Sequence, residues 1–283
     1  MTGWDPLHRA EHAWLDHAQA LYAQTGVSLR ETPVHYYLDG MRTGGSIHKD
    51  DLFVLRRILT GVDVETAFVV GAAFGFSSLF LASVLRGATV LSLDNWSEGT
   101  DGRRAGAICA SLAALDDDAC RRLRFATGHS PQDTGSSLEA AAMGQVDLAF
   151  IDGLHTNAQT MLDLEGVWPR LHHGSLVLLH DVRLFRLHEA LGWLVGQSAF
   201  DTVVMLNTAP GTVIAFNREV HPTAFRALQE PGMVAHWRPE LSTPESTTMR
   251  FPALGWSPDD DTREQRHHET PRPATRWPVR RTA

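Results

Sequence analysis

Short hydrophobic runs alternate with longer amphipathic segments through the middle of the chain. Five nearly continuous apolar runs, each typical of a buried β-strand, cover residues 66–70, 88–94, 122–128, 146–152 and 174–181. Segments with helical character lie between and after them, at residues 77–85, 104–120, 136–143, 157–171 and 187–197. Strands that are apolar on both faces and alternate with helices are typical of a parallel sheet covered on both sides. The pattern therefore predicts an α/β fold built on a doubly wound, Rossmann-like sheet.

This regular alternation breaks after the fifth run. Two further apolar runs, residues 200–207 and 211–217, are separated only by Thr208-Ala209-Pro210, which is too short for a parallel crossover. They are predicted to form an antiparallel hairpin, so the sheet is mostly parallel with an antiparallel strand at its C-terminal end. Ahead of the sheet, residues 6–25 and the segment starting at Asp50-Asp51 are predicted helices. The irregular stretch 32–48 between them is predicted to be a loop.

These elements divide the chain into three parts. Residues 1–48 hold an N-terminal helix and a segment expected on the substrate side of the fold, and residues 49–236 hold the α/β domain. After about residue 237, Pro, Arg, Asp and His dominate a segment, 237–283, that is predicted to be a flexible tail. The helical N-terminus also makes a homodimer possible.

Composition and charge restrict the function further. The formal net charge of -8 argues against nucleic acid as the main partner. The only cysteines, Cys109 and Cys120, have no metal-type spacing and fit a reducing compartment. The N-terminus is too polar for a signal peptide, and no apolar run reaches 18 residues. We therefore expect a cytoplasmic protein without a membrane segment.

A glycine turn and an acid mark the ends of the first two strands. Gly71-Ala-Ala-Phe-Gly75 follows the first strand, where glycine lets the backbone approach a ligand and the next helix directs its N–H groups at it. The two glycines do not meet the dinucleotide pattern GxGxxG, so a simple tight turn remains the alternative. Asp94 ends the second strand about twenty residues later, where an acid can accept the hydroxyls of a ribose. Its alternative role is a helix cap.

Two acid–histidine pairs mark the ends of the fourth and fifth strands. Asp152 and His155 follow one strand, and His180-Asp181 close the next. Adjacent parallel strands lie about 4.8 Å apart, so these groups are expected to converge. Carboxylates bind Mg²⁺, and histidine among the ligands admits Mn²⁺, Fe²⁺ or Zn²⁺. His155 is also a candidate general base. The alternative is that Asp152 caps the next helix and His155 is solvated.

Several weaker candidates lie near the same edge. Asn95 follows Asp94, and Ser130 follows the third strand, where the base of a nucleotide-like cofactor could rest. The aromatic and apolar side chains of Tyr36, Tyr37 and Met41 are candidates for covering the substrate, with packing as the alternative.

The order of these motifs resembles that of the class I S-adenosylmethionine-dependent methyltransferases, over about residues 40–218. VVGAAFGFSSLFLA resembles the cofactor loop of that family, LSLD its ribose-binding acid, and the final hairpin its antiparallel last strand. FIDGLHT followed by DLEGVWPRLHHGSLVLLHD resembles the metal-dependent O-methyltransferases of natural-product biosynthesis, which include macrolide, sugar and catechol-type enzymes.

The resemblance implies a seven-stranded methyltransferase fold in residues 49–236 and a small-molecule acceptor from secondary metabolism. It implies a divalent metal, Mg²⁺ or Mn²⁺, held by Asp152, His180 and Asp181, with His155 as the catalytic base and His180 as a further catalytic group. The implied residues for S-adenosyl-L-methionine are Gly71, Ala73, Gly75, Ser77, Asp94, Asn95, Ser130 and Asp152.

The sequence departs from the family pattern at two positions. Val69 stands where an acid usually precedes the first glycine, and His180 stands where a carboxylate or carboxamide is expected. Two alternatives therefore stay open. One is a metal-independent N- or C-methyltransferase that uses His155 and His180 as acid–base groups. The other is a non-catalytic protein that binds the cofactor.

Overall fold

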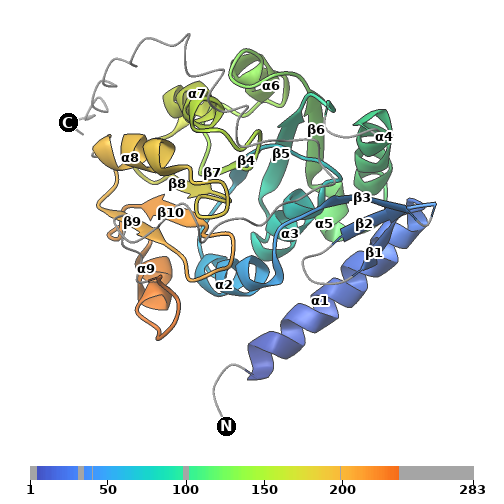
Figure 1. Cartoon of the computed structure of the whole chain (residues 1–283), viewed down its shortest axis with the longest axis horizontal. Helices are drawn as coiled ribbons and strands as arrows, with labels where there is room; N and C mark the ends of the chain where they lie inside the picture. Colours follow the sequence, from blue (N-terminus) through green and yellow to red (C-terminus); the bar gives the residue numbers. More distant parts are fainter. Residues whose placement is uncertain (1–4, 31–34, 40, 98–101, 198, 236–283) are drawn as a thin grey trace.

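A seven-stranded sheet forms the centre of the computed structural model, which describes residues 5–30, 35–39, 41–97, 102–197 and 199–235 (Figure 1). The strand order is β6-β5-β4-β7-β8-β10-β9. The strands are β4 (Thr66–Val70), β5 (Thr89–Asp94), β6 (Leu123–Thr127), β7 (Leu148–Ile151), β8 (Leu176–Leu179), β9 (Thr202–Met205) and β10 (Val213–Phe216). All seven predicted strands are present, and the tail predicted at 237–283 lies outside the described residues.

The directions of the strands also follow the prediction. β4 pairs in parallel with β5 and β7, and the outer strands β6 and β8 continue this direction. β10 is antiparallel to both of its neighbours, because it inserts between β8 and its hairpin partner β9. The predicted doubly wound sheet with a C-terminal antiparallel strand is confirmed.

Helices cover both faces of the sheet (Figure 1). One face carries α1 (Asp5–Gln24), α2 (Lys49–Leu59), α3 (Phe76–Val84), α4 (Gly102–Ala113), α5 (Asp118–Arg121) and α9 (Pro222–Leu228). The other carries α6 (Thr134–Ala140), α7 (Asn157–Val167) and α8 (His188–Gly196), with a 3-10 turn at Trp168–Arg170. The single helix predicted over 104–120 is divided, because Asp117 accepts the N–H groups of Ala119 and Cys120 and caps a new helix.

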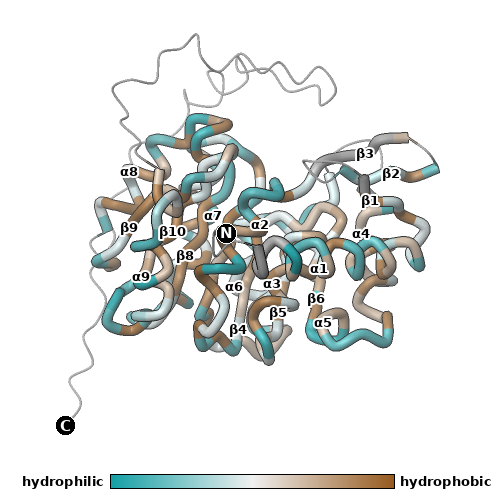
Figure 2. The backbone as a smooth tube through the Cα atoms, turned by 90° about the horizontal axis from the view of Figure 1, so that it is seen from below, coloured by the Kyte–Doolittle hydropathy of each residue, from teal (hydrophilic) through white to brown (hydrophobic). Residues whose placement is uncertain are grey.

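The pleat of the strands divides the core into two layers. In β4, Ala67 and Val69 pack with the layer under α1, α2 and α3, whereas Phe68 and Val70 pack with the layer under α7 and α8. Both sets are buried, which explains why β4 is apolar from Ala67 to Val70. Figure 2 shows these hydrophobic stretches along the central strands. Among the described residues, every helix is too short or too polar to span a membrane.

The loop predicted at 32–48 is wrong over most of its described length. β2 (His35–Leu38) and β3 (Met41–Gly45) join β1 (Ser28–Arg30) in a small antiparallel sheet beside α1 and α4 (Figure 1). Gly44 and Gly45, which favoured a loop, pair instead with Tyr36 and His35 of β2. The strands depend on contacts that are distant in sequence, above all the packing of Tyr36 against Phe74, so local composition did not reveal them.

The N-terminal helix packs directly against the glycine turn. The Tyr22 hydroxyl donates to the carbonyl oxygen of Phe74 at 2.6 Å. Trp14 makes edge contacts with the rings of Phe76 and Phe80 in α3. The turn that follows β4 is therefore held on its outer side by α1.

Candidate active site

The strand order places a topological switch between β4 and β7. The chain runs from β4 through β5 to β6 at one edge, then returns to β7 on the other side of β4. In open α/β sheets, ligands bind at the carboxyl ends of the strands at such a point. Gly71 follows β4 and has φ of +90°. A Cβ atom there would lie 2.1 Å from the carbonyl oxygen of Asp152, so the two loops meet at a contact that only glycine allows.

Asp94 ties the glycine turn to the end of β5. Its Oδ2 atom accepts the N–H groups of Ala72 at 2.8 Å and Ala73 at 2.9 Å, and its Oδ1 atom accepts that of Trp96 at 2.6 Å. An ionised carboxylate offers about four acceptor directions, so about one remains for a ligand. Gly75, in the left-handed conformation with φ of 83°, then starts α3, whose N-terminus faces the turn.

The remaining cofactor candidates lie around this turn and at the ends of the neighbouring strands. Ser77 is buried in the first turn of α3. Asn95, after β5, is exposed and accepts the Ser97 N–H at 2.9 Å. Ser130, after β6, accepts a hydrogen bond from the Gln159 side chain through its carbonyl oxygen at 2.8 Å. The predicted candidates after β4, β5 and β6 therefore occupy one edge of the sheet.

The register of β7 and β8 brings Asp152 and His180 together. Ile151 pairs with Leu179, and the His180 N–H donates to the Ile151 carbonyl at 3.0 Å. Ile151 and Leu179 belong to the layer under α7 and α8, so the next residue of each strand turns toward α2. The His180 Nδ1 and Asp152 Oδ1 atoms lie 2.8 Å apart.

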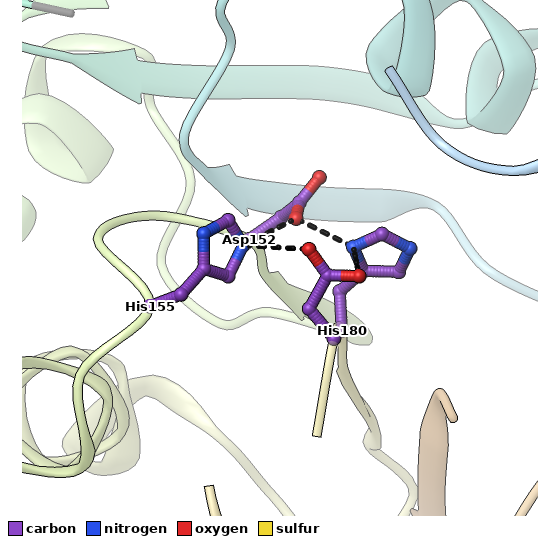
Figure 3. A group of neighbouring side chains, drawn as sticks. Asp152, His155 and His180 are labelled. Atoms are coloured by element: carbon purple, nitrogen blue, oxygen red, sulfur yellow. Dashed lines mark hydrogen bonds and ion pairs between the residues drawn. The ribbon is translucent and has the colours of Figure 1, made fainter. Parts of the chain in front are cut away.

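His155 and Asp181 complete the cluster. His155 Nε2 lies 3.2 Å from Asp181 Oδ2 and 3.4 Å from Asp152 Oδ1. Figure 3 shows the side chains of Asp152, His155 and His180 turned toward one another. Asp181 has φ of 58°, a left-handed conformation that aspartate tolerates better than most residues and that redirects the chain after β8. The Phe185 ring stacks on His155, with centroids 4.4 Å apart and planes 11° apart.

The two carboxylates and two imidazoles of the cluster shift one another's pKa values. Burial alone would raise the pKa of Asp152, but the charge of His180 lowers that pKa well below its ordinary value. Burial opposes a charged imidazole, yet Asp152 and Asp181 hold the pKa of His180 well above its ordinary value. Asp181 raises the pKa of His155 against the same burial. Burial raises the pKa of Asp181. The cluster therefore attracts a proton or another cation.

The donor set also fits a divalent metal ion. One ligand atom from each of Asp152, His155, His180 and Asp181 lies within 4.8 Å of all the others. Ligand atoms bonded at about 2.1 Å to one octahedral cation lie about 3.0 Å apart, close to the separations of 2.8–3.4 Å within this cluster. Two carboxylates and the imidazole of His180 suit Mn²⁺, Fe²⁺ or Zn²⁺ as well as Mg²⁺, and this set leaves His155 free of the metal.

Sequence reasoning missed two side chains that face this cluster. Asp51 in α2 was expected only as an acid at a helix start, yet it is fully buried with Oδ2 3.4 Å from His180 Nε2. Phe185 gave no signal beyond its hydrophobicity. Both contacts depend on how α2 and the segment after β8 pack onto the sheet, which no local pattern encodes.

The predicted substrate-side residues lie in different environments. Tyr36 is 1% exposed and packs against Phe74 of the glycine turn, with ring centroids 4.5 Å apart. Tyr37 is half-buried, and Met41 is 66% exposed.

A buried acid supports the turn between Asp152 and His155. Asp163 in α7 is 1% exposed and accepts the Gln159 amide at 2.7 Å. A Cβ atom on Gly153 would lie 3.1 Å from Asp163 Oδ2, which places this carboxylate directly against the turn. Burial raises the pKa of Asp163 from 3.8 to about 6.

Replacing Asp163 by asparagine is expected to flatten the dependence of stability on pH. Because the pKa of Asp163 is higher in the folded state than in the unfolded state, this group stabilises the fold below about pH 4. The stabilisation is lost as pH rises through about 6. The shift of about two units corresponds to about 3 kcal/mol. Urea unfolding at pH 4.5 and 8 should show Asp163→Asn more stable than wild type only at pH 8. Glu165→Gln, on the same helix, is the control, and equal pH dependence in Asp163→Asn and wild type would contradict the assignment.

Together the strand order, the glycine turn and the acid after β5 define the class I methyltransferase fold. Residues 68–182 match the family model described as a methyltransferase domain. Within this segment, the chain therefore matches a methyltransferase domain. The matched segment runs from β4 to the residue after Asp181, so it contains both the glycine turn and the acid–histidine cluster.

Solved structures share this architecture at low sequence identity. Cofactor-bound Rv0187 from MTB is 15% identical, covers 72% of this chain and 89% of its own, and has a TM-score of 0.50. The apo structure of CalS11, a TDP-rhamnose 3'-O-methyltransferase of calicheamicin biosynthesis, is 18% identical, with coverage of 59% and 78% and a TM-score of 0.47. The O-methyltransferase TomG from Streptomyces achromogenes, in complex with SAM, is 15% identical, with coverage of 59% and 77% and a TM-score of 0.44. The comparison with curated proteins gives no match.

Proposed function

We propose that this protein transfers the methyl group of S-adenosylmethionine to an oxygen atom of a small-molecule acceptor of secondary metabolism. In this proposal Asp152, His180 and Asp181 hold a divalent cation, and His155 is the general base. The observation that carries the proposal is the contact between the glycine turn at Gly71 and the loop of Asp152. This contact supports the proposal because it joins the loop of the acid–histidine cluster to the turn expected to bind the cofactor.

The residues around the glycine turn fit the cofactor. Gly71, Ala73, Gly75 and Ser77 supply a backbone turn and a helix N-terminus, which suit the polar methionine portion. Asp94 keeps about one acceptor direction for a ribose hydroxyl. Asn95 and Ser130 follow the next strands outward, where the adenine ring would extend. Asp152 is the member of the acid–histidine cluster that would lie nearest the bound cofactor.

In this proposal His155 takes the proton of the acceptor. Its Nε2 atom faces Asp181 and Asp152, and the stacked Phe185 ring fixes the imidazole plane. When bound, a divalent cation would lower the pKa of an acceptor hydroxyl. A hydroxyl held beside Asp152 and Asp181 lies within reach of His155 Nε2, which accepts its proton. Most of the remaining rate enhancement comes from aligning the acceptor oxygen with the methyl group.

Exposed apolar side chains in the loop of the cluster and in β3 favour an acceptor with apolar surface. Leu154, between Asp152 and His155, is 46% exposed, and Met41 of β3 is 66% exposed. We propose that residues 1–48 supply the substrate-side cover, with Tyr37 and Met41 nearest the acceptor and Tyr36 supporting the glycine turn from beneath.

The engagement of both His180 nitrogens favours a second candidate. Nδ1 lies 2.8 Å from Asp152, and Nε2 lies 3.4 Å from Asp51. In a metal-independent N- or C-methyltransferase, a doubly hydrogen-bonded His180 and the His155–Asp181 pair would serve as the acid–base groups.

Calorimetric titration distinguishes the two candidates without knowledge of the acceptor. Purified protein is treated with EDTA and titrated with S-adenosylmethionine, S-adenosylhomocysteine, and then Mg²⁺, Mn²⁺ or Fe²⁺. We expect cofactor binding together with a separate metal-binding signal. Cofactor binding with no metal signal would favour the histidine-based candidate. A protein that binds no cofactor under any of these conditions would contradict the proposed methyl transfer.

A further inference from the structure

We propose that Asp51 is the positioning residue for His180: it fixes the imidazole so that Nε2–H points into α2 and Nδ1 faces the acid–histidine cluster. This inference rests on the metal-assisted function proposed above and adds to it a residue outside the predicted site. The structural basis is the juxtaposition of α2, the end of β8 and the start of β10 around one buried imidazole.

The two oxygens of the Asp51 carboxylate each face one partner, Thr212 and His180. Asp51 is fully buried, and its Oδ1 atom accepts the Thr212 hydroxyl at 2.6 Å. Thr212, also fully buried, fixes the rotation of the carboxylate and leaves Oδ2 facing His180 Nε2 at 3.4 Å. The first turn of α2 stabilises the negative charge, since the unpaired N–H groups of a helix start favour an acid there.

An imidazole that binds a metal ion through one nitrogen keeps a proton only on the other, and the partner of that second nitrogen decides the orientation of the ring. Asp51 has no proton to give when ionised, so it can only accept the Nε2–H of His180. Nδ1 donates to the Asp152 Oδ1 atom at 2.8 Å in the absence of a metal ion, and it is the nitrogen that a cation held by Asp152 and Asp181 would bind in place of that proton. Carboxylates that accept the second N–H of a metal-binding histidine fix its tautomer and orientation in this way.

The decisive measurement is the affinity of the full-length protein for Mn²⁺ alone, by calorimetry, in Asp51→Ala and Thr212→Val. Loss of such a carboxylate typically weakens metal binding about 10- to 100-fold. We expect that loss in Asp51→Ala, and a smaller one in Thr212→Val, where the carboxylate remains but is free to rotate. Asp50→Ala removes an exposed acid one residue away and should bind Mn²⁺ as wild type does. S-adenosylmethionine affinity should be retained in all three variants, which also verifies that they fold.

A spectroscopic signature separates positioning from general structural support. In ¹⁵N-histidine-labelled protein, the Nε2–H of His180 should give a downfield imidazole resonance, assigned by its absence in His180→Gln. The signal should disappear in Asp51→Ala and persist in Asp50→Ala. Unchanged Mn²⁺ affinity with a persistent resonance in Asp51→Ala overturns the inference. If wild type binds no Mn²⁺, the proposed metal site fails, and the resonance alone decides the role of Asp51: its loss in Asp51→Ala supports positioning, and its persistence refutes it.

Discussion

Replacing Asp152 and Asp181 together by asparagine is expected to abolish methyl transfer, to below roughly a thousandth of the wild-type kcat/KM, or a loss of more than about 4 kcal/mol of transition-state stabilisation. Asparagine keeps the volume of each side chain but removes both negative charges. The two acids are the partners of His155 and His180 in the structure, so their loss leaves His180 with Asp51 as its remaining acidic partner and replaces two charged ligands of a cation by neutral amides.

This variant is assayed as S-adenosylhomocysteine formed with a hydroxylated acceptor identified from a panel of phenols, catechols and glycosides. Mn²⁺ affinity, measured without acceptor, should fall in parallel. Asp116→Asn is the matched control, because the Asp116 side chain is 97% exposed and far from the cluster in sequence. Turnover retained in the double variant would refute the role of these acids in any form of the mechanism.

Replacing His155 by alanine is expected to lower kcat by about 10²- to 10⁴-fold, the usual contribution of a general base. Asp181 raises the pKa of His155 against the effect of burial, so wild-type activity should rise with pH through a value above the ordinary one for histidine. Protonated His155 has no lone pair to offer, which explains the loss at low pH. In His155→Ala this acidic limb should disappear.

The control for His155 is His173→Gln, which removes an exposed imidazole paired with Glu219 elsewhere on the surface. Phe185→Ala offers a graded test, because it keeps the base but removes the ring stacked on it. We expect Phe185→Ala to lower kcat less than His155→Ala does. A His155→Ala variant with wild-type kcat and an unchanged pH profile would exclude His155 as the base.

Prediction from the sequence succeeded where a local pattern encodes the structure. The central strands β4, β7 and β8 are apolar on both faces, and the three-residue link after residue 207 permits only an antiparallel hairpin. The register that follows from adjacent strand ends brought Asp152 and His180 together as expected. Local patterns failed for β2 and β3, whose pairing depends on Tyr36 packing against Phe74 of a distant turn.

In the candidate site, too, some residues could be predicted from local sequence patterns and others could not. The ends of β7 and β8 were readable because strand ends gather at one edge of a parallel sheet. Asp51 was not, because an acid in the first turn of a helix looks the same whether it faces water or a buried imidazole. Only the docking of α2 onto the sheet, through the buried residues Leu52 and Leu55, decides between the two.

The reversed direction of β10 has a consequence for how this scaffold can diversify. The parallel strands end at the edge of the sheet that carries the cluster, whereas β10 begins at that edge. Val213, the first residue of β10, therefore pairs with Leu179 at the end of β8. The short turn before β10 therefore borders the edge that carries the acid–histidine cluster, and the Arg183 N–H donates to the Pro210 carbonyl at 3.0 Å. Changes in the length of this one turn could alter which acceptors fit while every strand of the sheet stays in register.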